Sequence, residues 1–149
     1  MVTREEGILD ALKELAPNAN VEVTAKAGYT PEGVDVGDAW VQSNKDLNVV
    51  VGINDAGVLG VYESFKSAGI KNDKLGMFGG DAVDDAVAAI EEGGAFKATV
   101  STNMLKNANY FIDMAVELAK NGKLEEREKL FPLEGITADN VAEYKKSIE

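Results

Sequence analysis

Stretches with the apolar spacing of a helix alternate with short strand-like runs along most of the chain. Ile8, Leu9, Leu12 and Leu15 recur at helical spacing, whereas residues 21–25 alternate between apolar and polar types, as in a strand. Short apolar runs that end in polar residues predict further strands over 48–54, 75–79 and 96–100. Helices are expected over 4–15, 31–44, 55–68, 83–92 and 105–121, an extended segment at 131–133, and a short last helix opening at 137–140.

This alternation predicts an α/β fold with three layers. Short connections between helices and strands imply a mostly parallel sheet, right-handed crossovers and helices on both faces, in a flavodoxin-like topology. Residues 1–149 are expected to form a single lobe, since the length suits one domain. The chain opens on a helix, however, whereas such a unit normally opens on a central strand. The first strand is therefore expected to be missing.

The predicted helix over 105–121 has an apolar face too broad for a helix surrounded by water. Some other part of the protein, or a partner, must therefore cover this face. The apolar positions of this helix are Met104, Ala108, Phe111, Ile112, Ala115, Val116, Leu118 and Ala119.

The composition of the chain argues against several classes of function. The net charge of −11 and the lack of a basic cluster argue against binding to nucleic acid. With no histidine and no cysteine, the chain has no Ser-His-Asp triad and no His- or Cys-ligated metal site. It also lacks the glycine motifs that bind phosphates, so no cofactor and no catalysis are expected. No apolar run is long enough to span a membrane, and residues 1–6 do not resemble a signal peptide.

Polar residues follow three of the predicted strands. The carboxyl ends of parallel strands meet at one edge of the sheet, which is where open α/β sheets bind ligands. Asn and Asp offer donors and acceptors to hydroxyl groups, and an Arg fork donates in a fixed geometry, so the set suits a small polyhydroxylated ligand. Asn and Asp before a helix are also ordinary N-caps, and that alternative stays open. The candidates are Asn54, Asp81 and Thr102 or Asn103, together with Thr3 and Arg4 at the start of the first helix.

Tyr29 lies in a predicted loop at the same edge of the sheet. Its ring could stack on a sugar, or it could be an ordinary half-buried surface tyrosine. Trp40 and Phe78 are expected in the core rather than in the site.

Several segments, in their order and spacing, resemble the carboxyl-terminal half of type I periplasmic sugar-binding proteins, the ribose- and galactose-type receptors of ABC importers. The resemblance covers nearly the whole chain. It rests on Arg4-Glu-Glu-Gly7, Asn54-Asp-Ala-Gly-Val-Leu-Gly60, Phe78-Gly-Gly-Asp81, Ala88-Ala-Ile-Glu-Glu-Gly93, Ala98-Thr-Val100 and Gly135-Ile-Thr-Ala-Asp-Asn-Val-Ala-Glu-Tyr144.

The resemblance implies a sugar or polyol receptor lobe in which Arg4, Asn54 and Asp81 hydrogen-bond the ligand. Thr102 stands where that family usually has an amide, and Tyr29 lies near its stacking aromatic. The first lobe of the family is absent. The resemblance implies that residues 104–149 include a hinge-crossing helix and a C-terminal segment that would pack on this missing first lobe. The expected partners are therefore the missing lobe or a second copy, possibly with swapped helices, and an ABC permease. The implied location is the periplasm or a lipid anchor outside the cell.

Three other interpretations stay open at this point. The ligand-binding cores of lac-repressor-type regulators share the fold, so the chain could sense an effector. It could also be a stand-alone flavodoxin-like protein or enzyme that has lost the binding role. Finally, it could be a fragment that binds no ligand and self-associates.

Overall fold

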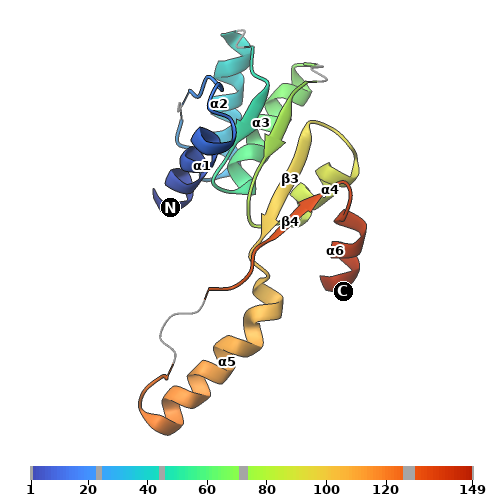
Figure 1. Cartoon of the computed structure of the whole chain (residues 1–149). Coiled ribbons are helices and arrows are strands. Elements are labelled where there is room, and N and C mark those ends of the chain that lie inside the picture. The colour runs from blue at the N-terminus through green and yellow to red at the C-terminus, as the bar shows by residue number, and fades with distance from the viewer. Residues whose placement is uncertain (1, 23–24, 44–45, 71–73, 126–129, 149) are drawn as a thin grey trace.

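The computed structural model describes residues 2–22, 25–43, 46–70, 74–125 and 130–148. Figure 1 shows helices packed around a small sheet, with the long helix α5 extending away from it. The α/β class predicted from the alternation is confirmed. In chain order the elements are α1 (Val2–Leu15), α2 (Thr30–Gln42), β1 (Val49–Val51), α3 (Asp55–Ser67), β2 (Gly76–Phe78), α4 (Asp84–Glu91), β3 (Phe96–Ser101), α5 (Met104–Asn121), β4 (Glu134–Thr137) and α6 (Val141–Ile148).

The sheet of the described residues has the order β1-β2-β3-β4. Strands β1, β2 and β3 are parallel, so their carboxyl ends lie at the same edge, as predicted. Strand β4 returns antiparallel to β3, with Val100 opposite Gly135. The sequence predicts only an extended segment at 131–133; the strand itself forms at 134–137, where the chain pairs with β3.

The strand predicted over 21–25 is not found in the part of the chain that the structure describes. Val21, Glu22 and Ala25 lie outside any strand, and residues 23–24 lie outside the described ranges. An alternation of apolar and polar residues indicates which side chains could face a core. A strand forms, however, only where a neighbouring strand forms hydrogen bonds with its backbone. Val21 is 46% exposed, so this segment gains little by burying its apolar side.

The core lies between the sheet and the helices α3 and α4, which pack against β2 and β3. Its most buried members come from the strands and from α4: Met77, Phe96, Ile136 and Ala86 are each at most 1% exposed. Trp40 packs against this core and Phe78 is half-buried. On β1, Val50 is buried in the core, whereas Val49 and Val51, on the other face of the strand, are exposed.

Helices α2 and α3 approach each other through glycines. A Cβ on Gly33 would lie 3.0 Å from Cα of Gly60, and one on Gly37 would lie 2.7 Å from Cβ of Ser64. Ser64 also donates a hydrogen bond of 3.0 Å to the carbonyl oxygen of Val34 across this contact. The glycines weaken α2 as an isolated helix but allow the close packing that holds it in place.

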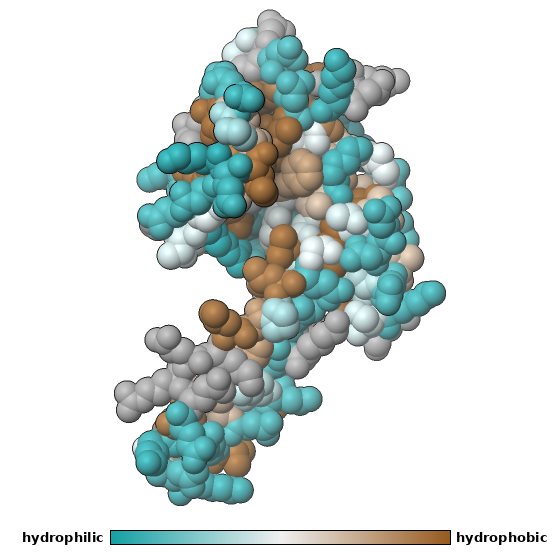
Figure 2. All heavy atoms as spheres, viewed as in Figure 1, coloured by the Kyte–Doolittle hydropathy of each residue, from teal (hydrophilic) through white to brown (hydrophobic). Residues whose placement is uncertain are grey.

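Helix α5 carries its apolar face exposed. Figure 2 shows hydrophobic residues at the surface of this part of the chain. Near the start of the helix, the rings of Tyr110, Phe111 and Phe131 meet edge to face, with centroids 5.2–6.4 Å apart. The exposed large apolar residues of α5 are Met104, Phe111, Ile112, Val116 and Leu118.

Candidate functional site

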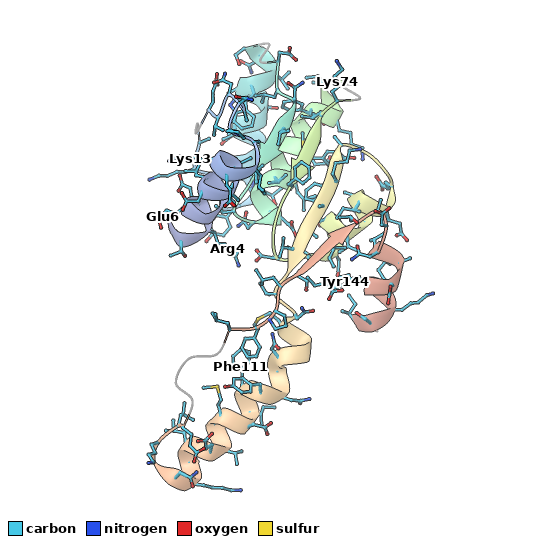
Figure 3. The ribbon with its side chains drawn as sticks, in the orientation of Figure 1. Arg4, Glu6, Lys13, Lys74, Phe111 and Tyr144 are labelled. Atoms are coloured by element: carbon cyan, nitrogen blue, oxygen red, sulfur yellow. The ribbon has the colours of Figure 1, made fainter. Side chains whose placement is uncertain are left out.

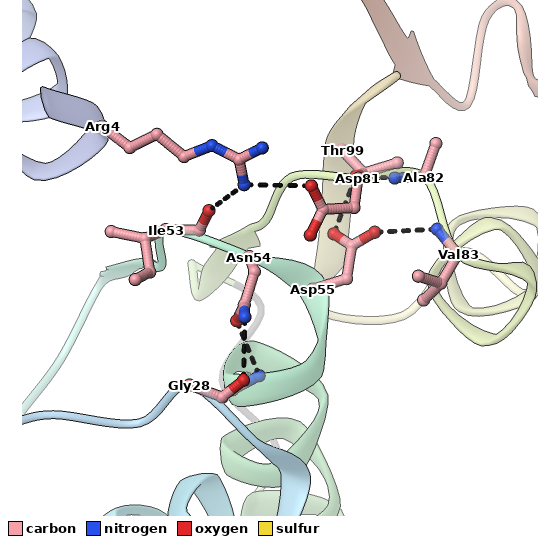
Figure 4. Close-up of polar contacts among 10 residues, drawn as sticks. Arg4, Gly28, Ile53, Asn54, Asp55, Asp81, Ala82, Val83 and Thr99 are labelled. Carbon is pink, nitrogen blue, oxygen red and sulfur yellow. Dashed lines mark hydrogen bonds and ion pairs between the residues drawn. The ribbon is translucent and has the colours of Figure 1, made fainter. Parts of the chain in front are cut away.

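Arg4 joins helix α1 to the carboxyl end of the sheet. Figure 3 shows this residue near the end of the lobe from which α5 departs. Its Nη1 donates to the carbonyl oxygen of Ile53 and to Oδ1 of Asp81, each at 2.9 Å (Figure 4). Ile53 follows β1 and Asp81 follows β2, so the ion pair spans the ends of two strands. The side chains of Arg4 and Asp81 are 45% and 38% exposed, so water screens the pair and it adds little to stability.

Both atoms of the Asn54 amide are occupied. Its Oδ1 accepts the backbone N–H of Gly57 at 3.1 Å, which caps helix α3. Its Nδ2 donates to the carbonyl oxygen of Gly28 at 2.8 Å, which ties the loop before α2 to the end of β1 (Figure 4). Capping therefore accounts for the contact of Oδ1, and the contact of Nδ2 fixes the loop before α2.

Asp55 lies beneath the site and is fully buried at 0% exposure. Its Oδ1 accepts the hydroxyl of Thr99 at 2.7 Å, and its Oδ2 accepts the backbone N–H of Val83 at 3.0 Å. Burial raises the pKa of the Asp55 carboxyl above its ordinary value of 3.8, and the neighbouring Asp81 acts in the same direction. The hydrogen bonds from Thr99 and Val83 oppose that rise because they favour the ionised form.

The segment 79–83 connects β2 to α4 and carries Asp81. Asp81 and Ala82 both have positive φ angles, 111° and 55°, which residues other than glycine seldom adopt. Backbone hydrogen bonds hold the segment on both sides: Asp55 N–H donates to Gly80 at 2.7 Å, and Asp81 N–H donates to Val100 at 2.8 Å. The Ala82 N–H donates to the Thr99 hydroxyl at 3.1 Å.

Tyr29 and Thr102 are not joined to this cluster by the hydrogen bonds of the described residues. Tyr29 is the N-cap of α2 and is 73% exposed; its backbone follows Gly28, to which Asn54 is bound. Thr102 is half-buried, and its carbonyl oxygen accepts Nδ2 of Asn107 in α5. The alternative candidate Asn103 donates from its side chain to Pro132, toward the C-terminal segment.

Sequence reasoning missed Asp55 and Thr99 as parts of the site. A carboxylate that directly follows a strand and begins a helix fits the role of a helix cap, so the sequence gives no sign of a further role for Asp55. A polar residue within an apolar strand was the available signal for Thr99, which is 1% exposed. A buried hydroxyl requires a partner, and here that partner is the carboxylate of Asp55.

No group of three or more His, Asp or Glu side chains could hold a metal ion among the described residues. Within the same residues, no helix has the length and apolar character needed to cross a membrane.

Comparison with protein families gives a match to the periplasmic binding protein domain over residues 1–124. A Rhizobium meliloti protein described as rhizopine-binding is 31% identical over 113 residues, which is 76% of this chain and 36% of that protein. The D-galactose/methyl-galactoside binding periplasmic protein of Haemophilus influenzae is 29% identical over 119 residues, 73% of this chain and 35% of its own length. The chain thus spans about a third of each relative.

Solved structures show the same fold. The Caulobacter myo-inositol binding protein, solved with myo-inositol, has a TM-score of 0.82 and 26% identity, covering 95% of this chain and 48% of that one. A galactofuranose binding protein has a TM-score of 0.83 and 25% identity, covering 98% and 50%. The predicted resemblance is confirmed, and the chain belongs to the periplasmic binding protein domain family.

Proposed function

We propose that this lobe binds a sugar or polyol at the carboxyl end of its sheet, through Arg4 and Asp81. The observation that carries the proposal is the contact between these two side chains across the ends of β1 and β2. Relatives named for binding galactosides, myo-inositol and galactofuranose support a ligand of this class.

The hydrogen-bonding capacity of the pair suits such a ligand. Among the described residues, only Nη1 of the Arg4 guanidinium makes hydrogen bonds, so Nη2 and Nε remain as donors. Oδ2 of Asp81 likewise accepts no hydrogen bond from those residues. A carboxylate oxygen beside a guanidinium N–H can accept one hydroxyl while the guanidinium donates to its neighbour.

The other predicted residues take different parts in this proposal. Asn54 binds the loop at Gly28 and caps α3. Its main role in this proposal is therefore to hold these two segments in place, and contact with the ligand is secondary. The exposed ring of Tyr29 would stack on one side of the ligand. Thr102 would contribute its hydroxyl from the end of β3.

We also propose that the lobe works as one half of a solute receptor for an ABC importer, in the periplasm or anchored outside the cell. The exposed apolar face of α5 would pack on the other half, or on a second copy that takes its place. Closure of two halves over a ligand would bury it and transmit the bound state, with no chemical step.

Thermal unfolding with myo-inositol, D-galactose and D-ribose tests the binding proposal. A sugar at 100 times its dissociation constant adds about 2.7 kcal/mol to the free energy of unfolding. For a domain of this size that corresponds to a rise of roughly 5–10 °C in melting temperature. Asp81→Ala and Arg4→Ala should each abolish the rise. Asp10→Ala is the matched control, because it removes an exposed carboxylate from the same helix as Arg4 and should keep the rise.

No rise with any of the three sugars would refute binding by this lobe alone. A rise that survives in Asp81→Ala would place the ligand elsewhere. Sedimentation of the wild type and of Phe111→Ser, which removes an apolar ring from the face of α5, tests whether that face binds a second copy.

A further inference from the structure

Two buried residues accept hydrogen bonds from the segment that presents Asp81. Thr99 on β3 and Asp55 at the start of α3 both contact the segment 79–83 from inside the lobe (Figure 4). Neither makes a hydrogen bond to Arg4, whose two bonds go to Ile53 and Asp81. Their contacts are therefore separate from the surface on which the proposed ligand would lie.

We propose that Asp55 and Thr99 are positioning residues, which hold the segment 79–83 so that Asp81 meets Arg4 and the ligand. This inference rests on the proposed role of Asp81 in binding. It adds two residues that do not touch the ligand.

The backbone of the segment requires such support. Positive φ angles at two successive residues other than glycine persist only where the surroundings hold them. The N–H groups of three successive residues are bound: Asp81 to Val100, Ala82 to Thr99, and Val83 to Asp55. Two of these three acceptors are side chains, so the conformation depends on the identity of residues 55 and 99.

The hydrogen bonds run in one direction and end on a single carboxylate. The Ala82 N–H donates to the Thr99 hydroxyl, which in turn donates to Oδ1 of Asp55, while Oδ2 accepts from Val83. A hydroxyl can accept one bond and donate another, and a carboxylate can accept both. Serine could replace Thr99 in this chain of bonds, but valine of the same shape could not.

Close packing restricts the segment further. A Cβ on Gly79 would lie 3.0 Å from Cα of Asp55 and 3.2 Å from its carboxylate carbon. The first residue of the segment can therefore lie against Asp55 only as glycine. The carboxylate thus contacts the segment at both ends, at Gly79 and at Val83.

The test compares Thr99→Val with Thr99→Ser by amide hydrogen exchange in NMR and by calorimetric titration with myo-inositol. In Thr99→Val the Ala82 amide should exchange about tenfold faster than in the wild type, the factor expected for loss of one buried hydrogen bond. Affinity for myo-inositol should fall by a similar factor. Thr99→Ser should restore both quantities to within about twofold of the wild type.

A merely structural role for Thr99 would lower the melting temperature of both variants without the selective exchange of Ala82 or the rescue by serine. Should Thr99→Val fail to fold, Asp55→Asn replaces it, because it puts an NH₂ group where one of the two acceptor oxygens stood. Faster exchange at Ala82 or Val83 is then the expected result.

Exchange at Ala82 that is unchanged in Thr99→Val would overturn the positioning role. Where Asp55→Asn replaces that variant, unchanged exchange at both Ala82 and Val83 would overturn it. Failure of the wild type to bind myo-inositol counts against the proposed function instead. The exchange measurement needs no ligand and still decides whether residues 55 and 99 hold the segment.

Discussion

Replacing Gly60 with alanine is expected to destabilise the protein, although alanine is the better helix former. Gly60 lies in α3 where that helix meets α2. An added Cβ would lie 2.7 Å from the backbone nitrogen of Val34 and 2.8 Å from the carbonyl carbon of Gly33. These are backbone atoms, which cannot turn aside as the end of a flexible side chain can.

The magnitude follows from two opposing effects. Inserting a methyl group into a packed contact typically costs ~1–3 kcal/mol, and backbone neighbours on more than one side place Gly60 at the upper end. Alanine recovers about 1 kcal/mol of helix propensity. The net loss is about 2 kcal/mol of unfolding free energy, or roughly 4–8 °C in melting temperature for a protein of this size.

Thermal unfolding followed by circular dichroism measures this loss, and Gly7→Ala is the matched control. Gly7 lies inside α1, and a Cβ there would meet nothing within 4 Å. The same substitution should therefore leave the melting temperature unchanged or raise it, by no more than the ~1 kcal/mol of helix propensity. If Gly60→Ala melts at or above the wild-type temperature, the close approach of α2 and α3 is wrong.

Three further outcomes are expected. Burial raises the pKa of the Asp55 carboxyl above 3.8, so its contribution to the free energy of unfolding is largest below pH 3.8 and falls as the pH rises through the raised pKa. Melting curves over the acid range should therefore show the wild type losing stability relative to Asp55→Asn as the pH rises. Parallel curves for the two proteins would contradict the raised pKa. Without sugar, Arg4→Gln should change the free energy of unfolding by no more than ~1 kcal/mol in chemical denaturation, since the ion pair is half exposed, and a larger loss would assign Arg4 a structural role. Tyr144→Phe should cost about 1 kcal/mol in the same assay, because it removes the buried bond of 3.2 Å to Ser101, and a more stable variant would argue against that bond.

Much of the lobe follows from local pattern. Helical spacing of apolar residues predicted α3, α4 and α5 to within about two residues. The sequence also predicted that Asn54 and Asp81 lie at one edge of the sheet, because parallel strands bring their carboxyl ends together. These features can be predicted from the spacing of apolar residues along the chain and from the parallel direction of the strands.

Other features depend on partners distant in the chain. Glycine at position 33 lowers the helix propensity of α2, yet Gly33 lies where a second helix comes within contact distance. The alternating run at 21–25 indicated a strand, but Val21, Glu22 and Ala25 lie outside any strand, because alternation does not supply a neighbour to pair with.

The site divides in the same way. The sequence alone determined which polar residues stand at the ends of the strands, since that depends on where each apolar run stops. Only the tertiary structure decided that Asn54 is occupied as a cap and that Asp55 is buried against Thr99, 44 residues away in the chain. The hydrogen-bond partner of a buried polar group depends on how distant segments pack together, so it cannot be predicted from the pattern of a single segment.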